Sequence, residues 1–287
     1  MAGVIDKDRR SKVLRILAKV VVYIYLIAMA IGMVLPFYWS IITSFKDNSV
    51  MFTDFSLLPD FGHMTGDHWV RAFEELNFLQ YVGNTLIVTV VGLFTNLVLG
   101  SMAAYGFTKL RFKGRNAIFR VMLASMMLPG IVALVPQFSV IYTLGLYDTL
   151  APIVLPGAVG VYAIFFMRQF IVNLSDEYRE AGKIDGANEL LIFFRLYLPM
   201  LIAGMITLGV FTFNSYWNSY MWPSIVISSE ENMVVALALQ DFETYVGTDY
   251  GALMAGSLLI CLPVLALFIA AQKFFLTDVQ LVGASKE

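Results

Sequence analysis

The residues best suited to binding chemistry lie in one apolar stretch, 213–222, which reads FNSYWNSYMW. Asn214 and Asn218 are four residues apart and would share one face of a helix, as would Ser215 and Ser219. Amides and hydroxyls exchange hydrogen bonds with a polyhydroxylated solute, and aromatic rings cover its apolar faces. The pattern predicts a path for an uncharged polar solute. The candidate residues are Asn214, Tyr216, Trp217, Asn218 and Tyr220.

The same stretch has a second interpretation. Its amides would bond to neighbouring helices, and its aromatic rings would lie at a membrane interface. Asn84, Asn96 and Gln137 lie in other apolar stretches and have the same two interpretations.

Other reactive groups are few. His63 and His68 are five residues apart in a polar stretch that reads as a solvated loop, and the single Cys261 excludes an intrachain disulfide. No charged residue lies in the middle of an apolar block, which argues against a proton- or ion-coupled carrier. The phosphate-binding pattern G-x-x-x-x-G-K-[ST] is absent. We therefore expect no catalytic residue, metal site, cofactor or nucleic-acid partner, and any ATP must be bound by another chain.

The composition is that of a membrane protein. Of 287 residues, 59% are hydrophobic and 14% charged, whereas soluble domains carry about 25% charged residues. Six apolar blocks are long enough to cross a bilayer as helices. They cover residues 20–42, 83–105, 118–142, 150–170, 200–227 and 253–275. The first exceeds a signal-peptide core, and Pro129, Gly130 and Pro136 predict a kink or break in the third. The expected fold class is an all-α polytopic membrane protein with six transmembrane helices.

The positive-inside rule predicts the orientation. If both termini are cytoplasmic, all of the 19 Lys and Arg residues except Lys46 and Arg71 lie on the cytoplasmic side. The predicted segments are a cytoplasmic N-terminal segment 1–19, a membrane domain 20–275, external loops 46–82 and 228–252, and a cytoplasmic tail 276–287.

The cytoplasmic segment 173–199 reads as two short helices joined by a turn. Ser175 is a suitable N-cap, with acidic residues after it in the first turn. Gly186 suits a turn that requires close approach or a positive φ, and Pro199 suits the start of the next helix. A short polar helix pair that projects from a membrane domain is suited to docking another protein.

The amino-acid sequence of this segment resembles the EAA signature of binding-protein-dependent ABC importer permeases. The sequence EAGKIDGA at 180–187 is followed by Leu198-Pro199, and the IDGA form resembles the carbohydrate branch. Further matches follow in order along the chain. They are SFK (44–46), NTL (84–86), AAYGF (103–107), FKGR (112–115), LP (128–129), LGL (144–146), RQF (168–170), WN (217–218) and QKFF (272–275). Together they resemble the second, six-span permease of the maltose-type pair.

This resemblance implies the type I importer permease fold in a bacterial inner membrane. The implied partners are a second permease, two ATPase subunits that bind ATP and Mg²⁺, an external solute-binding protein and the lipid bilayer. Segment 173–199 would couple the permease to the ATPase, and loop 228–252 would meet the binding protein. The implied coupling residues are Glu180, Ala181, Gly182, Asp185, Gly186 and Ala187.

Two features depart from the family pattern. Gly182 replaces the second alanine of the signature, which we expect to loosen that helix by about 1 kcal/mol. The tail 281–287 matches the family's ending only loosely. The alternatives to a sugar importer are a secondary carrier or channel, which would not need the docking segment, and a membrane enzyme, which would need a clustered set of catalytic groups.

Overall fold

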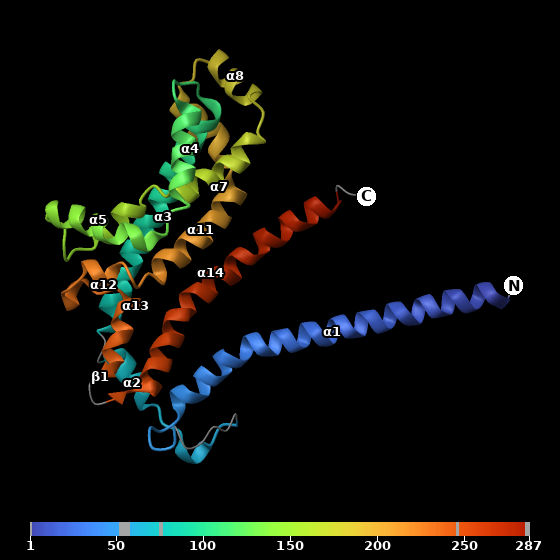
Figure 1. The fold of residues 1–287 in the computed structure, drawn as a ribbon, viewed down its shortest axis with the longest axis vertical. Helices are drawn as coiled ribbons and strands as arrows, with labels where there is room; N and C mark the ends of the chain where they lie inside the picture. The colour runs from blue at the N-terminus through green and yellow to red at the C-terminus, as the bar shows by residue number, and fades with distance from the viewer. Residues whose placement is uncertain (1, 52–57, 75–76, 245–246, 285–287) are drawn as a thin grey trace. The chain divides into compact units, whose positions relative to one another are not determined.

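The computed structural model describes residues 2–51, 58–74, 77–244 and 247–284 and is almost entirely helical (Figure 1). It divides into two compact units. One comprises Met1–Ala72 with Phe242–Leu258, and the other comprises Phe73–Asp241 with Leu259–Glu287.

Within the described residues, three helices have stretches long and apolar enough to cross a bilayer singly. They are α1 (Ala2–Phe45), α3 (Phe78–Lys109) and α14 (Tyr250–Ala284). Three bent helix pairs pass the same test. They are α4 (Arg115–Ser125) with α5 (Gly130–Thr143), Ala151–Gly157 with α7 (Val161–Val172), and Glu189–Met200 with α11 (Ile202–Trp217). If each bent pair is one span, the total is the six that the sequence predicts.

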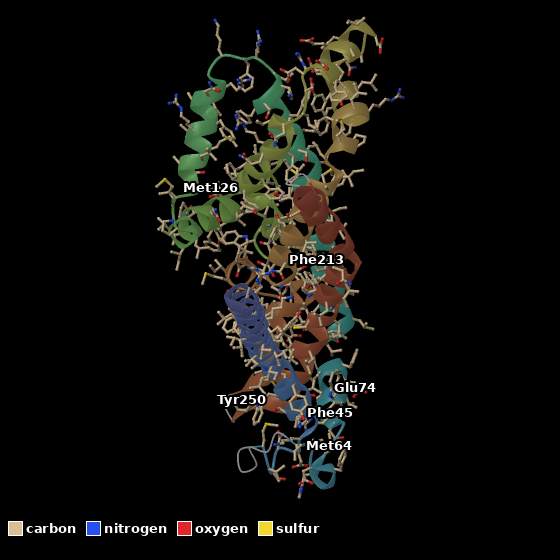
Figure 2. All side chains as sticks on the ribbon, turned by 90° about the vertical axis from the view of Figure 1, so that its right-hand side faces the viewer. Phe45, Met64, Glu74, Met126, Phe213 and Tyr250 are labelled. Atoms are coloured by element: carbon tan, nitrogen blue, oxygen red, sulfur yellow. The ribbon has the colours of Figure 1, made fainter. Side chains whose placement is uncertain are left out.

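The bends explain where the predicted blocks differ from the helices. The third block is broken as expected, with a bend of 105° between α4 and α5, and Met126 lies at this bend (Figure 2). Pro136, by contrast, lies inside α5 without ending it. The prediction that the fifth block is helical over 200–227 is wrong at its C-terminal end. Helix α11 stops at Trp217, where the Asn218 amide donates back to the Asn214 carbonyl and satisfies a terminal acceptor.

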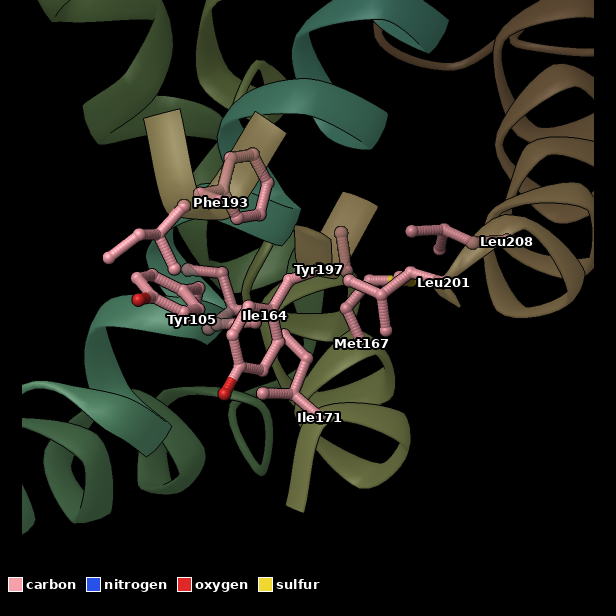
Figure 3. Close-up of a cluster of buried hydrophobic side chains, with 11 residues drawn as sticks. Tyr105, Ile164, Met167, Ile171, Phe193, Tyr197, Leu201 and Leu208 are labelled. Atoms are coloured by element: carbon pink, nitrogen blue, oxygen red, sulfur yellow. The ribbon is translucent and has the colours of Figure 1, made fainter. Parts of the chain in front are cut away.

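Helix α3 is the centre of the second unit, and α7 and α11 pack along it. Small residues permit this close packing. A Cβ on Gly100 would lie 3.0 Å from that of Ala163 on α7. The buried cluster in Figure 3 includes Tyr105 from α3, Met167 from α7, and Phe193 and Tyr197 from a π-helical turn (Phe193–Tyr197) between α9 (Glu189–Ile192) and α10 (Leu198–Met200).

The two ends of α3 meet different short elements. Helix α8 (Glu177–Ile184) lies beyond the Lys109 end (Figure 1). A 3-10 turn (Glu230–Asn232) and α13 (Val235–Ala238) pack on the Phe78 end, and α12 (Pro223–Val226) packs on α6 (Ala151–Val154), which Leu155–Gly157 continues as a 3-10 turn. A 32-residue helix is about 48 Å long. The predicted cytoplasmic segment 173–199 and much of the predicted external loop 228–252 therefore lie at opposite ends of one spanning helix.

The first unit shows that His68 is not a solvated loop residue. It lies in α2 (Asp67–Glu74), its side chain is almost fully buried, and Nε2 is 2.9 Å from the Lys46 carbonyl oxygen. Its Nδ1 is 3.2 Å from Asp249 Oδ1, although the angle there is too poor for a hydrogen bond. His63, in a 3-10 turn (Phe61–His63), is exposed and contacts Asp60. A 3-10 turn (Leu239–Phe242) precedes strands β1 (Glu243–Thr244) and β2 (Gly247–Thr248) in the sequence, and the two strands pair antiparallel.

Candidate functional site: an exposed helix pair and a polar cavity

Helix α8 is bounded by interactions local to the segment. At its start, the Ser175 hydroxyl accepts a hydrogen bond from the Glu177 N–H at 3.2 Å. At its end, the Ala187 N–H donates to the Gly182 carbonyl and the Gly186 N–H donates to the Lys183 carbonyl, the pattern of a Schellman motif. This motif requires a left-handed residue, and Gly186 has φ +77°. The positive φ that the sequence suggested at Gly186 is therefore present.

The predicted docking residues divide into two groups by exposure. Glu180, Ala181, Asp185 and Gly186 are exposed, together with the apolar Ile184, whose side chain is 87% exposed. Gly182 is buried and Ala187 is half-buried. Helix α8 therefore presents a mixed charged and apolar surface that no other part of the described chain covers.

Gly182 has a packing role that the sequence did not reveal. A Cβ at this position would lie 2.9 Å from Cγ1 of Ile192 and 3.3 Å from Cδ1 of Leu196. Glycine therefore allows α8 to approach the helix that begins at Glu189. The helix continues through Gly182 to Ile184.

A cluster of polar and charged side chains fixes α8 to its neighbours. The Glu189 carboxylate accepts hydrogen bonds from Arg179 Nε at 3.1 Å on Oε1 and 3.2 Å on Oε2. Lys183 Nζ lies 3.1 Å from its Oε1. Its other oxygen accepts the Tyr105 hydroxyl of α3 at 2.7 Å. Because Arg179 and Lys183 are on α8, Glu189 connects α8, α9 and α3. We call these four residues the Glu189 cluster.

A second connection joins the beginning of the segment to α3. The Lys109 ammonium donates to the Leu174 carbonyl and the Asp176 carboxylate, both at 2.6 Å. The Tyr197 hydroxyl donates to the Ser175 carbonyl at 3.1 Å. The hydrogen bond from Lys109 holds the pKa of Asp176 below its usual value. The helix pair is thus anchored to α3 at two places.

The opposite end of α3 is also connected by polar side chains. Asn84 donates to the carbonyls of Glu231 and Met233 at 2.8 and 2.9 Å. Asp148 Oδ1 accepts the N–H groups of Ser228 and Ser229, both at 2.9 Å, and these bonds hold the pKa of its carboxyl below the usual value. No motif in the sequence distinguishes Asp148, Lys109 or Glu189 as a structural link. The sequence alone offers no spacing that pairs them with residues so distant in the chain.

A polar cavity lies between the two ends. It has a volume of about 410 Å³ and is bounded by α3, α5, α7, α11 and the turns beside them. Its polar side chains are Asn96, Gln137, Thr212, Ser215, Tyr216 and Ser219, and its aromatic walls are Tyr162, Phe211 and Trp222. Of the candidate pathway residues, only Tyr216 lines this cavity, beside the two serines that were expected to share a helix face.

The other four candidates lie elsewhere. Trp217 is 1% exposed, and its indole N–H donates to the Ile260 carbonyl at 2.9 Å, so it has a structural role inside the chain and not the place at a membrane interface that the second interpretation gave to the aromatic rings. Asn218 follows the last turn of α11 and donates to Asn214 Oδ1 at 2.9 Å. Tyr220 is exposed and its hydroxyl contacts Gln240. The expected shared face of Asn214 and Asn218 exists, but their amides bond to each other.

Asn96 links α3 to the break that precedes α7. Its amide donates to the carbonyls of Gly92 and Gly157 at 3.0 and 2.8 Å and accepts the Gly160 N–H at 3.0 Å. Asn84 and Asn96 therefore bond to neighbouring segments of the chain, which is close to the second interpretation, although their partners lie in turns beside the helices and Asn96 also lines the cavity. The described residues contain no group of three or more His, Cys, Asp or Glu that could hold a metal ion.

Known proteins are similar to this chain in sequence and in fold. Residues 96–278 match the family described as binding-protein-dependent transport system inner membrane component. An arabinooligosaccharide transport system permease protein of Halalkalibacterium halodurans is 29% identical over 87% of this chain and 90% of that protein. A lactose transport system permease protein of Rhizobium radiobacter is 30% identical over 91% of this chain and 94% of its own length. The fold matches a chain from the crystal structure of a bacterial ABC transporter that imports the acidic polysaccharide alginate, with a TM-score of 0.80 and 22% identity over 89% of this chain and 95% of that one.

Proposed function

Because the chain belongs to the family of binding-protein-dependent transport inner membrane components, we propose that it imports a sugar or oligosaccharide as one permease subunit of an ATP-binding cassette importer. The arabinooligosaccharide and lactose permeases among its relatives support this substrate class. The uncharged cavity beside α3 and α11 supports it as well, because it offers amide, hydroxyl and aromatic groups. The chain is a transport subunit and not an enzyme.

The proposed assembly contains a second permease, two ATPase subunits that bind ATP and Mg²⁺, and an external solute-binding protein. The observation that carries the coupling proposal is the exposed surface of α8. Ile184 is 87% exposed, with the Glu180 and Asp185 carboxylates nearby in the sequence. An apolar side chain surrounded by charged ones fits a protein contact, which has an apolar centre and a polar rim. We assign this surface to the ATPase and the loop 228–252 to the binding protein.

The Glu189 cluster provides a route for movement from the ATPase to the membrane helices. When the ATPase subunits close, a docked α8 moves with them. Its Arg179 and Lys183 hold Glu189, and Glu189 holds Tyr105 on α3. Since α7 and α11 pack along α3, displacement of α3 changes the walls of the cavity. Alternating access then needs no titrating group in the membrane. A proton- or ion-coupled secondary carrier, by contrast, usually has one.

The test is transport by the whole importer in proteoliposomes. The chain is co-expressed with its partner permease, ATPase and binding protein, and uptake is measured for lactose, arabinotriose and an oligogalacturonate. We expect uptake that requires internal ATP and the binding protein and that continues in the presence of an ionophore. Uptake that stops with the ionophore and needs no ATP would contradict the proposal.

A further inference from the structure

The polar cavity contains side chains that are not used within the chain. The Gln137 amide and the hydroxyls of Ser215 and Ser219 make no hydrogen bond to any residue that the structure describes. Some helical hydroxyls outside the cavity, such as those of Thr85 and Thr207, instead donate to the carbonyl one turn earlier. The cavity hydroxyls therefore remain available to a molecule inside it.

Tyr216 occupies the space of two missing side chains. A Cβ on Gly92 would lie 2.4 Å from its ring, and one on Gly157 would lie 2.9 Å from its hydroxyl. The hydroxyl lies near the Asn96 amide. Both hydrogens of that amide are donated to the carbonyls of Gly92 and Gly157, and the Tyr216 hydroxyl has no hydrogen-bond partner among the residues that the structure describes. In an apolar environment, an unsatisfied polar group is unfavourable unless water or a solute contacts it.

Broken helices form part of the cavity wall. Pro156, Gly157 and Gly160 line it where the helix preceding α7 bends by 45°. Non-helical backbone at membrane depth is tolerated where it is buried in protein or faces a water-filled cavity. Asn96 lies about 27 Å from the Phe78 end of α3 and about 20 Å from the Lys109 end. The cavity is therefore near the middle of the spanning helix, where transporters hold their substrates.

The cavity has no charged wall residue. None of its lining residues is Asp, Glu, Lys, Arg or His. A carboxylate or phosphate taken from water would need a cationic partner there, because burial of an unpaired charge is costly. Its volume of about 410 Å³ lies within the range of roughly 300–1,000 Å³ for small-molecule sites. A neutral solute with many hydroxyls fits both the chemistry and the size.

We propose that this chain carries its own sugar-contact site, for a neutral polyhydroxylated solute, in which Gln137, Ser215 and Ser219 bind solute hydroxyls during passage. The inference rests on the proposed function as a sugar permease. It deepens that function by placing contacts in this subunit and by excluding acidic sugars such as uronate polymers. It also replaces Asn214, Trp217, Asn218 and Tyr220 as the expected contacts.

The first test measures thiol reactivity in the assembled importer. In a Cys261→Ser background, Ser219→Cys is treated with a small hydrophilic methanethiosulfonate. We expect it to react, because Ser219 is partly exposed and lines a polar cavity large enough to admit water. Its reaction should slow at least about threefold with binding protein carrying the neutral sugar that supports uptake, and less with empty binding protein. The matched control is Ser224→Cys, an exposed position outside the cavity, which should show no difference between loaded and empty binding protein.

The second test measures uptake and covers the case in which the introduced thiol impairs assembly. Loss of one neutral hydrogen bond by Gln137→Ala should lower uptake at subsaturating sugar by about 2- to 10-fold. Ser139→Ala, two residues away on α5 and outside the cavity, should leave it unchanged.

The outcomes separate this site from the proposed function. An unreactive thiol, equal protection by loaded and empty binding protein, or unchanged uptake in Gln137→Ala would overturn the site while ATP-driven sugar uptake stands. Uptake confined to the oligogalacturonate would overturn the neutral class alone. No ATP-dependent sugar uptake by the wild-type importer would instead overturn the proposed function.

Discussion

The Tyr105 hydroxyl donates a hydrogen bond of 2.7 Å to Glu189, 84 residues away in the sequence. This bond joins α3 to the helix pair that carries the proposed ATPase contact. Arg179 and Lys183 hold the same carboxylate from α8. A carboxylate shared among three donors is partly desolvated and fixes the relative positions of the elements that supply them.

Tyr105→Phe should therefore reduce coupling without preventing assembly. The substitution removes one hydrogen bond worth about 1 kcal/mol or somewhat more, because its acceptor is charged. We expect the number of solute molecules imported per ATP hydrolysed to fall while the ATPase still co-purifies. The control is Tyr142→Phe, since Tyr142 is exposed on α5 and its hydroxyl has no hydrogen bond within the described chain. An unchanged transport-to-hydrolysis ratio in Tyr105→Phe would remove α3 from the coupling route.

Substitutions at Gly186 should separate backbone strain from steric contact with the ATPase. An added Cβ meets no atom within 4 Å in this chain, but the φ of +77° is strained for most L-residues by about 1–2 kcal/mol. If strain dominates, Gly186→Asn should retain more co-purified ATPase than Gly186→Val, because asparagine tolerates this conformation. If close docking dominates, both variants should lose the ATPase to the same extent.

We expect Gly186→Asp to remain in the membrane and to release the ATPase or uncouple hydrolysis from uptake. Normal co-purification, transport and stimulated hydrolysis in Gly186→Asp would contradict the docking assignment.

Gly182→Ala should destabilise the helix pair even though alanine favours a helix by about 1 kcal/mol. Its Cβ would meet buried Ile192 at 2.9 Å, and Ile192 would have to shift within a packed cluster. Gly106→Ala is the matched control, because Gly106 is within α3 and its Cβ would meet nothing within 4 Å. Thermal unfolding in detergent should show a lower midpoint for Gly182→Ala and an equal or higher one for Gly106→Ala. The opposite order would refute the close approach of α8 to Ile192.

Trp217→Phe should lower stability and leave the sugar dependence of uptake unchanged. The substitution removes the indole N–H that donates to the Ile260 carbonyl, at a site that is 1% exposed. We expect a cost of about 1–3 kcal/mol from the unpaired carbonyl and the smaller ring. Uptake measured against sugar concentration should keep its half-saturation value. A shift of the half-saturation value with unaltered thermal stability would indicate that Trp217 contacts the solute.

The predicted topology can be tested by labelling single cysteines in a Cys261→Ser background. Lys183→Cys on α8 should be inaccessible to an impermeant thiol reagent in intact cells, and Glu231→Cys should be labelled, because 17 of the 19 basic residues flank the side assigned to the cytoplasm. Permeabilised cells provide the control that both thiols are reactive. Labelling of position 183 and not of position 231 in intact cells would reverse the orientation.

The sequence by itself determined that this is a membrane protein with as many as six spans, that the third apolar block breaks at Pro129 and Gly130, and which family the chain belongs to. These properties depend on local composition, on backbone groups that must be satisfied within each span, and on short ordered motifs. The sequence also predicted the turn at Gly186, because a glycine between two short helix patterns suits a left-handed conformation.

Only the tertiary structure decided which polar groups are already paired and which are free. Asn84, Asn96, Asn214 and Asn218 make hydrogen bonds within the chain, whereas Gln137, Ser215 and Ser219 face a cavity. Helix periodicity places Asn214 and Asn218 on one face but does not say what that face meets. The partners of Glu189 and Asp148 likewise come from segments distant in the sequence, and contacts of that kind are set by how the helices pack around α3.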